Sequence, residues 1–200
     1  MSARVDLVVG LGNPGPEYEH TRHNAGFWFL DALAYAHNVG FRQEKKFHGA
    51  VARIDVNGHE VWLLKPDTFM NLSGQAVQAL ASFYKIELTH ILVVHDDLDL
   101  SPGIARLKQG GGHGGHNGLR DIASRMGGNG FLRLRLGIGH PGDRQKVTGH
   151  VLKKATDDDR TEIERAIELA MRVLPDVVNG DLQKAMNQLH SQPGNGTRDE

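Results

Sequence analysis

The sequence contains no cysteine, and this absence excludes disulfide bonds, thiolate metal ligands and cysteine nucleophiles. It also lacks any run that approaches about 18 consecutive apolar residues, so we expect no membrane-spanning segment. The first residues lead directly into the short strand-like run Val5–Val9 without the basic, apolar and cleavage regions of a signal peptide. We therefore expect a cytoplasmic protein with no membrane partner.

An excess of charge of one sign is absent as well, because the 200 residues carry a net charge of only −1. Taken alone, this value argues against a nucleic-acid partner. However, residues 101–153 contain 9 Lys and Arg against 2 Asp and Glu, and they also hold 14 of the 25 glycines. A polyanion responds to such a local field rather than to the average. The alternative is a solvated basic face that pairs with the acidic ends of the chain.

Apolar runs with strand character alternate with segments of helical periodicity, and this alternation predicts an α/β fold. The dipeptide Asn57-Gly58 indicates a hairpin, which makes the mainly parallel sheet a mixed one. Ser73, Asn117 and Thr156 are the expected helix N-caps. Strands are expected at 5–10, 50–56, 60–64, 91–94 and 131–138, and helices at 24–37, 73–84, 117–126, 156–178 and 181–190.

The length and the apolar content, 39% of the residues, suffice for one buried core. We expect a single catalytic α/β domain over residues 1–190, with helices flanking the mixed sheet. Residues 191–200 contain no apolar side chain to bury and are predicted to be a disordered tail. In the strand at 131–138, apolar residues alternate with Arg133 and Arg135, which predicts that one face is in solvent.

The loop Gly10–Gly15 formally fits the G-x-G-x-x-G pattern of dinucleotide-binding sites and follows a strand. Such a site uses free backbone amides at a helix start. Here Pro14 and Pro16 remove two amides, and no helical pattern begins before about residue 24. The acidic residue that such sites place at the end of a second strand is also missing. A nucleotide-dependent oxidoreductase therefore stays only as an alternative.

Other loops gather polar residues that suit catalysis. His23 lies near a helix start, whose positive end favours the neutral imidazole that acts as a base. The segment His95–Asp99 follows a strand, at the position where α/β folds place their ligands. With His113 and His116, its acids form an alternative zinc site. The glycine stretch 110–118 contains two histidines and an asparagine, which favours a binding loop over a flexible linker.

Six motifs occur in order along most of residues 5–153. As a set they resemble bacterial peptidyl-tRNA hydrolase, and the acidic helical C-terminal part fits the same family. The motifs are G-L-G-N-P-G at 10–15, T-R-H-N-A-G-F at 21–27, K-P-D-T-F-M-N-L-S-G at 65–74, H-D-D-L-D at 95–99, G-G-G-H-G-G-H-N-G-L at 110–119 and G-I-G-H-P-G at 137–142.

The resemblance implies hydrolysis of the ester that joins a peptide to the terminal ribose of tRNA, with no cofactor and no metal. It implies that His23 is the general base that activates water and that Asp96 fixes the tautomer and orientation of its ring. Asn13 would contact the peptide backbone and help to distinguish N-blocked from free aminoacyl-tRNA. Asn71 would polarise the ester carbonyl, and His116 would be an accessory substrate contact. The residues implied to line the site are Tyr18, Phe69, Met70, Asn71 and Asn117.

The implied partner is peptidyl-tRNA, and the family suggests a monomer. The absence of cysteine and of a G-x-S-x-G elbow agrees with attack by water rather than by a protein nucleophile. A non-catalytic RNA-binding module is the alternative, and it would need the basic segment but not the pair of His23 and Asp96. The candidates to hold tRNA phosphates are Lys108, Arg120, Arg133, Arg135 and Lys146.

Overall fold

Seven strands within residues 2–192, the part of the chain that the computed structural model describes, form one mixed sheet in the order β2-β3-β4-β1-β5-β7-β6. The three central pairs are parallel and the outer pairs are antiparallel, which confirms the predicted mixed sheet. The tail predicted at 191–200 lies outside the described residues from 193 onward. The strands are β1 (Leu7–Gly10), β2 (Arg42–Glu44), β3 (Gly49–Val56), β4 (His59–Pro66), β5 (Ile91–Asp97), β6 (Ala105–Gln109) and β7 (Leu132–Gly137).

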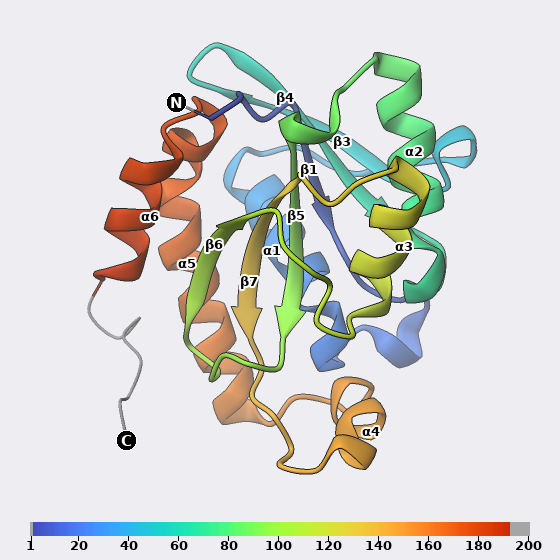
Figure 1. The fold of residues 1–200 in the computed structure, drawn as a ribbon, viewed down its shortest axis with the longest axis vertical. Helices are drawn as coiled ribbons and strands as arrows, with labels where there is room; N and C mark the ends of the chain where they lie inside the picture. The colour runs from blue at the N-terminus through green and yellow to red at the C-terminus, as the bar shows by residue number, and fades with distance from the viewer. Residues whose placement is uncertain (1, 193–200) are drawn as a thin grey trace.

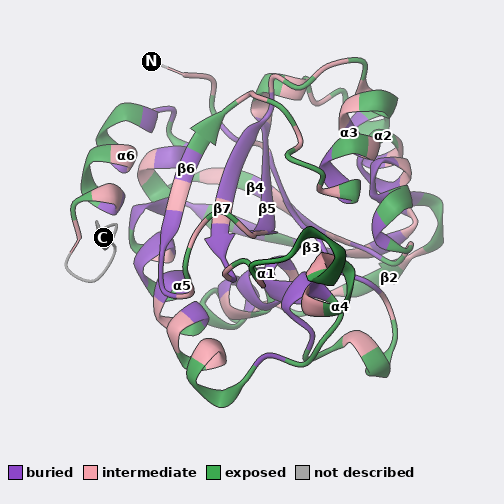
Figure 2. Ribbon diagram, turned by 60° about the horizontal axis from the view of Figure 1, so that its bottom comes forward, coloured by how far each residue is buried: buried purple, intermediate pink, exposed green. Residues whose placement is uncertain are grey.

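Helices cover both faces of this sheet (Figure 1). Because side chains alternate along a strand, Val8 of β1 faces α1, α5 and α6, whereas Leu7 and Val9 face α2 and α3. Figure 2 shows the result, with buried strands at the centre and exposed outer faces on the helices. The helices are α1 (Ala25–Ala36), α2 (Ser73–Tyr84), α3 (Asn117–Met126), α4 (Val147–Val151), α5 (Asp157–Val178) and α6 (Leu182–His190).

Local sequence signals account for several of these elements. The hairpin between β3 and β4 turns at Asn57 and Gly58, whose φ values of 52° and 84° are those that a two-residue hairpin turn requires. Thr156 caps α5, because its side chain accepts a hydrogen bond of 3.1 Å from the backbone amide of Asp159. The predicted hairpin and this cap are therefore confirmed, as is the predicted end of the helix at residue 126, which is followed by Gly127 with a φ of 74°.

Other expectations were wrong. Ser73 does not cap α2, because the helix begins at Ser73 itself and its hydroxyl donates to the carbonyl of Met70 at 2.7 Å. The strand expected at 91–94 continues to Asp97. The polar face of the strand at 132–137 is less open than expected, because the glycine stretch 110–118 covers Arg133, which is only 3% exposed, and Arg135 is half-buried. The strands β2 and β6 were not predicted.

The carboxyl ends of the parallel strands β1, β4, β5 and β7 meet at one edge of the sheet, where α/β folds place their ligands. The loops that follow β1 and β4 therefore lie close to the end of β5. The glycine-rich loop 110–116 reaches the same edge from the opposite end. It starts beside Leu132, at the beginning of β7, and it brings His116 to Asp96 near the end of β5.

The formal G-x-G-x-x-G segment serves helix packing in this fold. A Cβ on Gly10 would lie 2.4 Å from the carbonyl oxygen of Gly26, and one on Gly12 would lie 2.7 Å from the ring of Phe27. The first α-helix begins only at Ala25, ten residues after Gly15, whereas a dinucleotide site opens its helix at the last glycine of the loop. Within residues 2–192, no helix combines the length and apolar content that crossing a membrane requires.

We expect Gly26→Ala to destabilise the fold strongly, because the new Cβ would lie 2.4 Å from the carbonyl oxygen of Val94 and 2.5 Å from the amide nitrogen of Leu11. Both are backbone atoms, so α1 must move away from the sheet, at a cost of about 1–3 kcal/mol or more. Urea denaturation of the two proteins measures this difference. Gly40→Ala is the matched control, since a Cβ there meets no atom of residues 2–192 within 4 Å. Equal midpoints for Gly26→Ala and wild type would contradict the close approach.

Candidate active site

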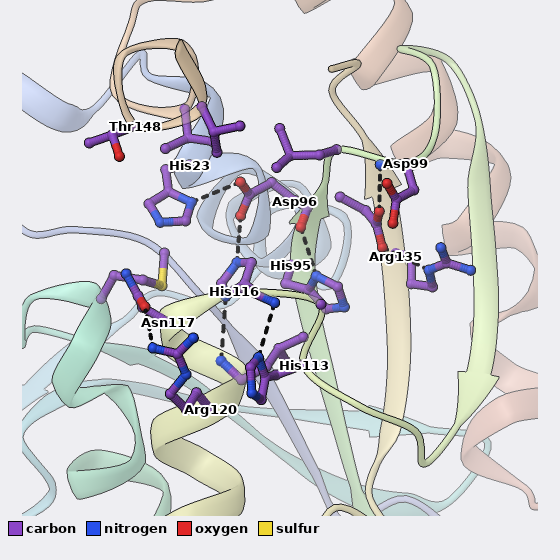
Figure 3. A pocket seen from close by; sticks show the side chains of 18 of the residues that line it. His23, His95, Asp96, Asp99, His113, His116, Asn117, Arg120, Arg135 and Thr148 are labelled. Carbon is purple, nitrogen blue, oxygen red and sulfur yellow. Dashed lines mark hydrogen bonds and ion pairs between the residues drawn. The ribbon is translucent and has the colours of Figure 1, made fainter. Parts of the chain in front are cut away.

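Asp96 lies near the carboxyl end of β5 and holds two histidine side chains (Figure 3). Its Oδ2 is 2.8 Å from Nδ1 of His23, and its Oδ1 is 2.8 Å from Nε2 of His116. His23 belongs to the single-turn helix Arg22–Asn24 before α1, and His116 ends the glycine-rich loop before α3. Segments that are distant in sequence thus form one unit, which we call the His–Asp–His cluster.

The hydrogen bonds of the cluster determine where its protons are. Nδ1 of His116 accepts from the backbone amides of Gly118 at 3.2 Å and Leu119 at 3.4 Å, so the ring proton of the neutral form is on Nε2, which donates to Asp96. The other carboxylate oxygen accepts from Nδ1–H of His23. Nε2 of His23 is then the unprotonated nitrogen, and it has no hydrogen-bond partner among the described residues. Such a nitrogen can take a proton from water.

The electrostatics of the cluster favour an ionised carboxylate and a basic imidazole. Burial alone would raise the pKa of Asp96, but the neighbouring His23 and His116 hold the pKa of this carboxyl group far below its usual range. Burial alone would lower the pKa of His23, but the charge of Asp96 and the hydrogen bond to it raise that pKa above its ordinary value. An opposite charge at hydrogen-bond distance stabilises the imidazolium that forms when His23 takes a proton.

His95 packs beside the cluster and was not predicted as a site residue. Burial and the proximity of His116 lower the pKa of His95 to about 4, so this ring is neutral near neutral pH. Its Nδ1 is 2.7 Å from the backbone oxygen of Asp96. The ring meets that of His116 edge to face, with the centroids 5.2 Å apart. His95 therefore supports the positions of Asp96 and His116 without adding charge.

A cavity of about 910 Å³ opens over the cluster. Every predicted site residue except Lys146 lines this cavity. Tyr18 and Phe69 meet edge to face on its wall, with ring centroids 6.2 Å apart. The predicted residues that the structure brings together here are Asn13, Tyr18, His23, Phe69, Met70, Asn71, Asp96, Lys108, His116, Asn117, Arg120, Arg133 and Arg135.

Asn117 is the first residue of α3 and not its cap, because the side chain that accepts the first amides is that of His116. This corrects the expected cap. The Oδ1 atom of Asn117 accepts a hydrogen bond of 3.3 Å from Arg120. Its amide nitrogen is therefore left to donate into the cavity. Asn71, in the turn before α2, is exposed on the same cavity wall.

The basic residues on the wall differ in what they can offer to a ligand. Lys108 is exposed, whereas Arg135 pairs with Asp97 at 2.8 Å. Arg133 is buried, and its guanidinium group donates to the carbonyl oxygens of Gly111 and Gly112. The structure thus places Arg133 as a support of the glycine-rich loop rather than as an exposed cation.

Two features of the site were missed in the sequence, one in the cavity wall and one beneath it. The short helix α4 contributes Val147, Thr148 and Val151 to the cavity, but five residues are too few for helical periodicity to reveal it. Asn24 lies directly beneath the site and makes two hydrogen bonds with the backbone of Asn13. Its signal was present in the T-R-H-N motif, next to His23, but it was not interpreted as part of the site.

Among residues 2–192, the one group with the spacing of metal ligands is the His–Asp–His cluster, whose ligand atoms all lie within 4.8 Å of one another. His113, which the alternative zinc site required, is not part of it. Its Nδ1 accepts from the amide of Gly115 at 3.0 Å. Both nitrogens of His116 and Nδ1 of His23 already make hydrogen bonds, so three of the four imidazole nitrogens of the cluster have partners within it or in the start of α3.

A family model described as peptidyl-tRNA hydrolase matches residues 7–196 of the chain. The chain belongs to the peptidyl-tRNA hydrolase family. The peptidyl-tRNA hydrolase of Aeromonas hydrophila is 57% identical over 192 residues, which are 96% of this chain and 97% of the relative. That of Neisseria gonorrhoeae is 55% identical and covers 96% of this chain and 100% of the relative. Membership in this family makes the protein a hydrolase.

The solved structures of the peptidyl-tRNA hydrolase family agree with this fold. The crystal structure of peptidyl-tRNA hydrolase from Acinetobacter baumannii matches with a TM-score of 0.93 at 48% sequence identity, over 97% of this chain and 98% of that chain. A complex of peptidyl-tRNA hydrolase with N-propanol matches with a TM-score of 0.91 at 49% identity, over 94% and 96% of the two chains. The α/β fold predicted from the sequence is therefore that of the family.

Proposed function

We propose that this protein hydrolyses the ester bond between a peptide, or an N-blocked aminoacyl group, and the 3′-terminal ribose of tRNA, with His23 as the general base. The observation that carries the proposal is the hydrogen bond of 2.8 Å between His23 and the buried Asp96 in the cavity wall. This pair leaves one imidazole nitrogen of raised basicity toward the cavity. Membership in the peptidyl-tRNA hydrolase family supports the same substrate.

The proposed step uses a water molecule as nucleophile. Its oxygen attacks the ester carbonyl carbon while Nε2 of His23 takes its proton, and a tetrahedral intermediate forms. The bond from this carbon to the ribose oxygen then breaks, and the proton passes from His23 to that oxygen. The products are a peptide carboxylic acid, which ionises, and tRNA with a free terminal hydroxyl. A positioned base of this kind contributes roughly 10²–10⁴ in rate.

Amide donors complete the site. We assign Asn71 to the ester carbonyl, where a hydrogen-bond donor to the developing oxyanion contributes on the order of 3 kcal/mol. Asn117 presents its amide nitrogen to the same cavity, since its oxygen is held by Arg120. Tyr18, Phe69 and Met70 offer apolar contacts to the peptide or to the terminal nucleotides.

Positive charge on the cavity wall supports a tRNA substrate. Lys108 and Arg135 face the cavity from neighbouring strands, and the basic segment 101–153 continues to Lys146 beside it. Contacts from such cations to phosphates position a nucleic acid without reading its sequence. An enzyme that uses only the acceptor end needs no further recognition, so we propose one substrate class that includes all peptidyl-tRNAs.

The direct test is the release of a labelled N-acetyl-aminoacyl group from tRNA by the purified protein, measured with and without excess chelator. We expect turnover in both conditions. Binding of tRNA without turnover would support the alternative of a non-catalytic RNA-binding module. Turnover that chelator abolishes and added metal restores would overturn the metal-free mechanism.

We expect Lys108→Ala to reduce the salt dependence of tRNA binding. A phosphate contact releases about one counterion, so the slope of log Kd against log salt concentration should become shallower by about one. Fluorescence titrations at several salt concentrations measure this slope. Lys184→Ala is the matched control, because Lys184 lies on α6 and pairs with Asp176 at 3.3 Å. Equal slopes for wild type and Lys108→Ala would place Lys108 away from the tRNA.

A further inference from the structure

Asn13 is held in the cavity wall by three hydrogen bonds, two of which it makes with Asn24. The backbone amide of Asn13 donates to Oδ1 of Asn24 at 2.8 Å, and Nδ2 of Asn24 donates back to the carbonyl oxygen of Asn13 at 3.0 Å. The third bond joins the backbone amide of Met70 to Oδ1 of Asn13 at 2.7 Å. Both asparagines are buried, so these contacts are shielded from competition by water.

The partners leave no ambiguity about how the two side-chain amides are oriented. A backbone N–H can only donate and a backbone carbonyl oxygen can only accept. The atom of Asn13 that faces Met70 must therefore be the oxygen, and Nδ2 must point the other way. Nδ2 makes no hydrogen bond to any described residue, and Asn13 lines the cavity. Asn13 thus presents only N–H donors to a ligand.

A donor that cannot rotate distinguishes between the two forms of an aminoacyl ester. An N-blocked group carries an additional carbonyl oxygen next to the α-nitrogen, which can accept from Nδ2 of Asn13. A free α-amino group is mostly an ammonium ion near neutral pH. It offers only donors, and it would meet the donor of Asn13 without a partner. A buried polar group left unpaired in this way is costly.

We propose that Asn24, which holds the backbone of Asn13, and the backbone amide of Met70, which orients its side chain, together lock Asn13 as a hydrogen-bond donor. Asn24 is thereby a positioning residue for the preference for N-blocked over free aminoacyl esters. This inference rests on the proposed function. Asn24 follows His23 directly in the chain, within the single-turn helix Arg22–Asn24. One turn of backbone therefore places both the base that activates water and the residue that aligns the donor.

The test compares Asn24→Asp with the wild type near neutral pH, using one tRNA charged with one amino acid in its free and its N-acetylated form. The isosteric aspartate keeps an acceptor for the amide of Asn13, but it puts a second oxygen against the carbonyl oxygen of Asn13. We expect the ratio of kcat/KM values, acetylated over free, to fall by about tenfold or more. Asn187→Asp, on the exposed face of α6, is the matched control and should keep the wild-type ratio.

A second variant keeps the proposal testable if Asn24→Asp does not fold. Asn13→Asp replaces the donor by an anionic acceptor while Oδ1 can still accept from Met70, so the ratio should shift toward the free ester even further. A preference within about twofold of the wild-type ratio in a folded Asn24→Asp protein, whatever its absolute rate, would overturn the role of Asn24. If the wild type hydrolyses neither ester, the proposed function itself fails, which is a different result from an unchanged ratio.

Discussion

Replacing His23 by alanine is expected to lower kcat for peptidyl-tRNA hydrolysis by roughly 10²–10⁴. The variant retains the cavity, the amide donors and the basic wall, so substrate binds but water is no longer deprotonated as it attacks. The affinity for tRNA should stay within about twofold of the wild-type value, because no phosphate contact is assigned to His23. Single-turnover rates with labelled N-acetyl-aminoacyl-tRNA measure the chemical step, and a binding titration measures the affinity.

His20→Ala is the matched control for this prediction. His20 lies in the same loop and its side chain is exposed, and its backbone oxygen accepts a hydrogen bond of 3.1 Å from the amide of Ala155. It should therefore hydrolyse the ester at the wild-type rate. A His23→Ala protein that also turns over at the wild-type rate would mean that the base lies elsewhere in the cavity.

The second large effect is expected for Asp96→Asn, and its direction follows from the hydrogen bonds of the cluster. The asparagine offers one oxygen and one NH₂ group to two imidazoles. His116 requires the oxygen, because its Nδ1 is already an acceptor for Gly118 and Leu119 and its proton is on Nε2. The NH₂ group must then face Nδ1 of His23. This donor forces the proton of His23 onto Nε2, the nitrogen that has to be free.

We therefore expect kcat for Asp96→Asn to fall by roughly 10²–10⁴, as for other base–carboxylate pairs in which the tautomer is reversed. The pH profile should change too. The base works when neutral, so wild-type kcat/KM rises with pH through the raised pKa of His23, above its ordinary value near 6.5. Without the charge of Asp96 this rise should move to lower pH.

Glu164→Gln, in which the lost carboxylate pairs with Arg160 at 2.8 Å on the surface of α5, should leave both the rate and the pH profile at their wild-type values. For Asp96→Asn, a wild-type rate together with an unshifted profile would remove Asp96 from the mechanism. Thermal unfolding of both variants, followed by circular dichroism, verifies that a lower rate reflects chemistry and not a smaller folded fraction.

Much of the fold could be predicted because the signals are local. The β3–β4 hairpin follows from Asn57-Gly58, and the start of α5 follows from Thr156 and the acidic residues after it. The features that were missed depend on contacts with other elements of the fold. The strand β6 is short and carries Arg106 and Lys108, and it is a strand because β7 offers its edge. Likewise, Arg133 looked solvent-exposed from alternation alone, but the glycine-rich loop covers it.

The site residues also separate into those that local sequence signals indicate and those whose positions depend on tertiary contacts. Asp96 was singled out because it follows a strand, where α/β folds place their ligands, and His23 because it lies near a helix start. Their pairing was implied by the family resemblance. The roles of His116 and Asn24 were not predictable from propensity. An imidazole that caps α3, and an amide that pairs with a distant backbone segment, are tertiary contacts. Both become visible only when the loops are placed against one another.

The sharing of one carboxylate by two imidazoles also bears on how the reaction ends. In the proposed mechanism the His–Asp–His cluster holds one net negative charge at rest and none while His23 carries the proton. When the ribose oxygen takes that proton, the negative charge returns as the peptide product gains its own ionised carboxylate. The cleaved peptide then faces an anion in a low-dielectric wall. In this proposed mechanism the same buried charge assists the attack and also promotes the expulsion of the acid.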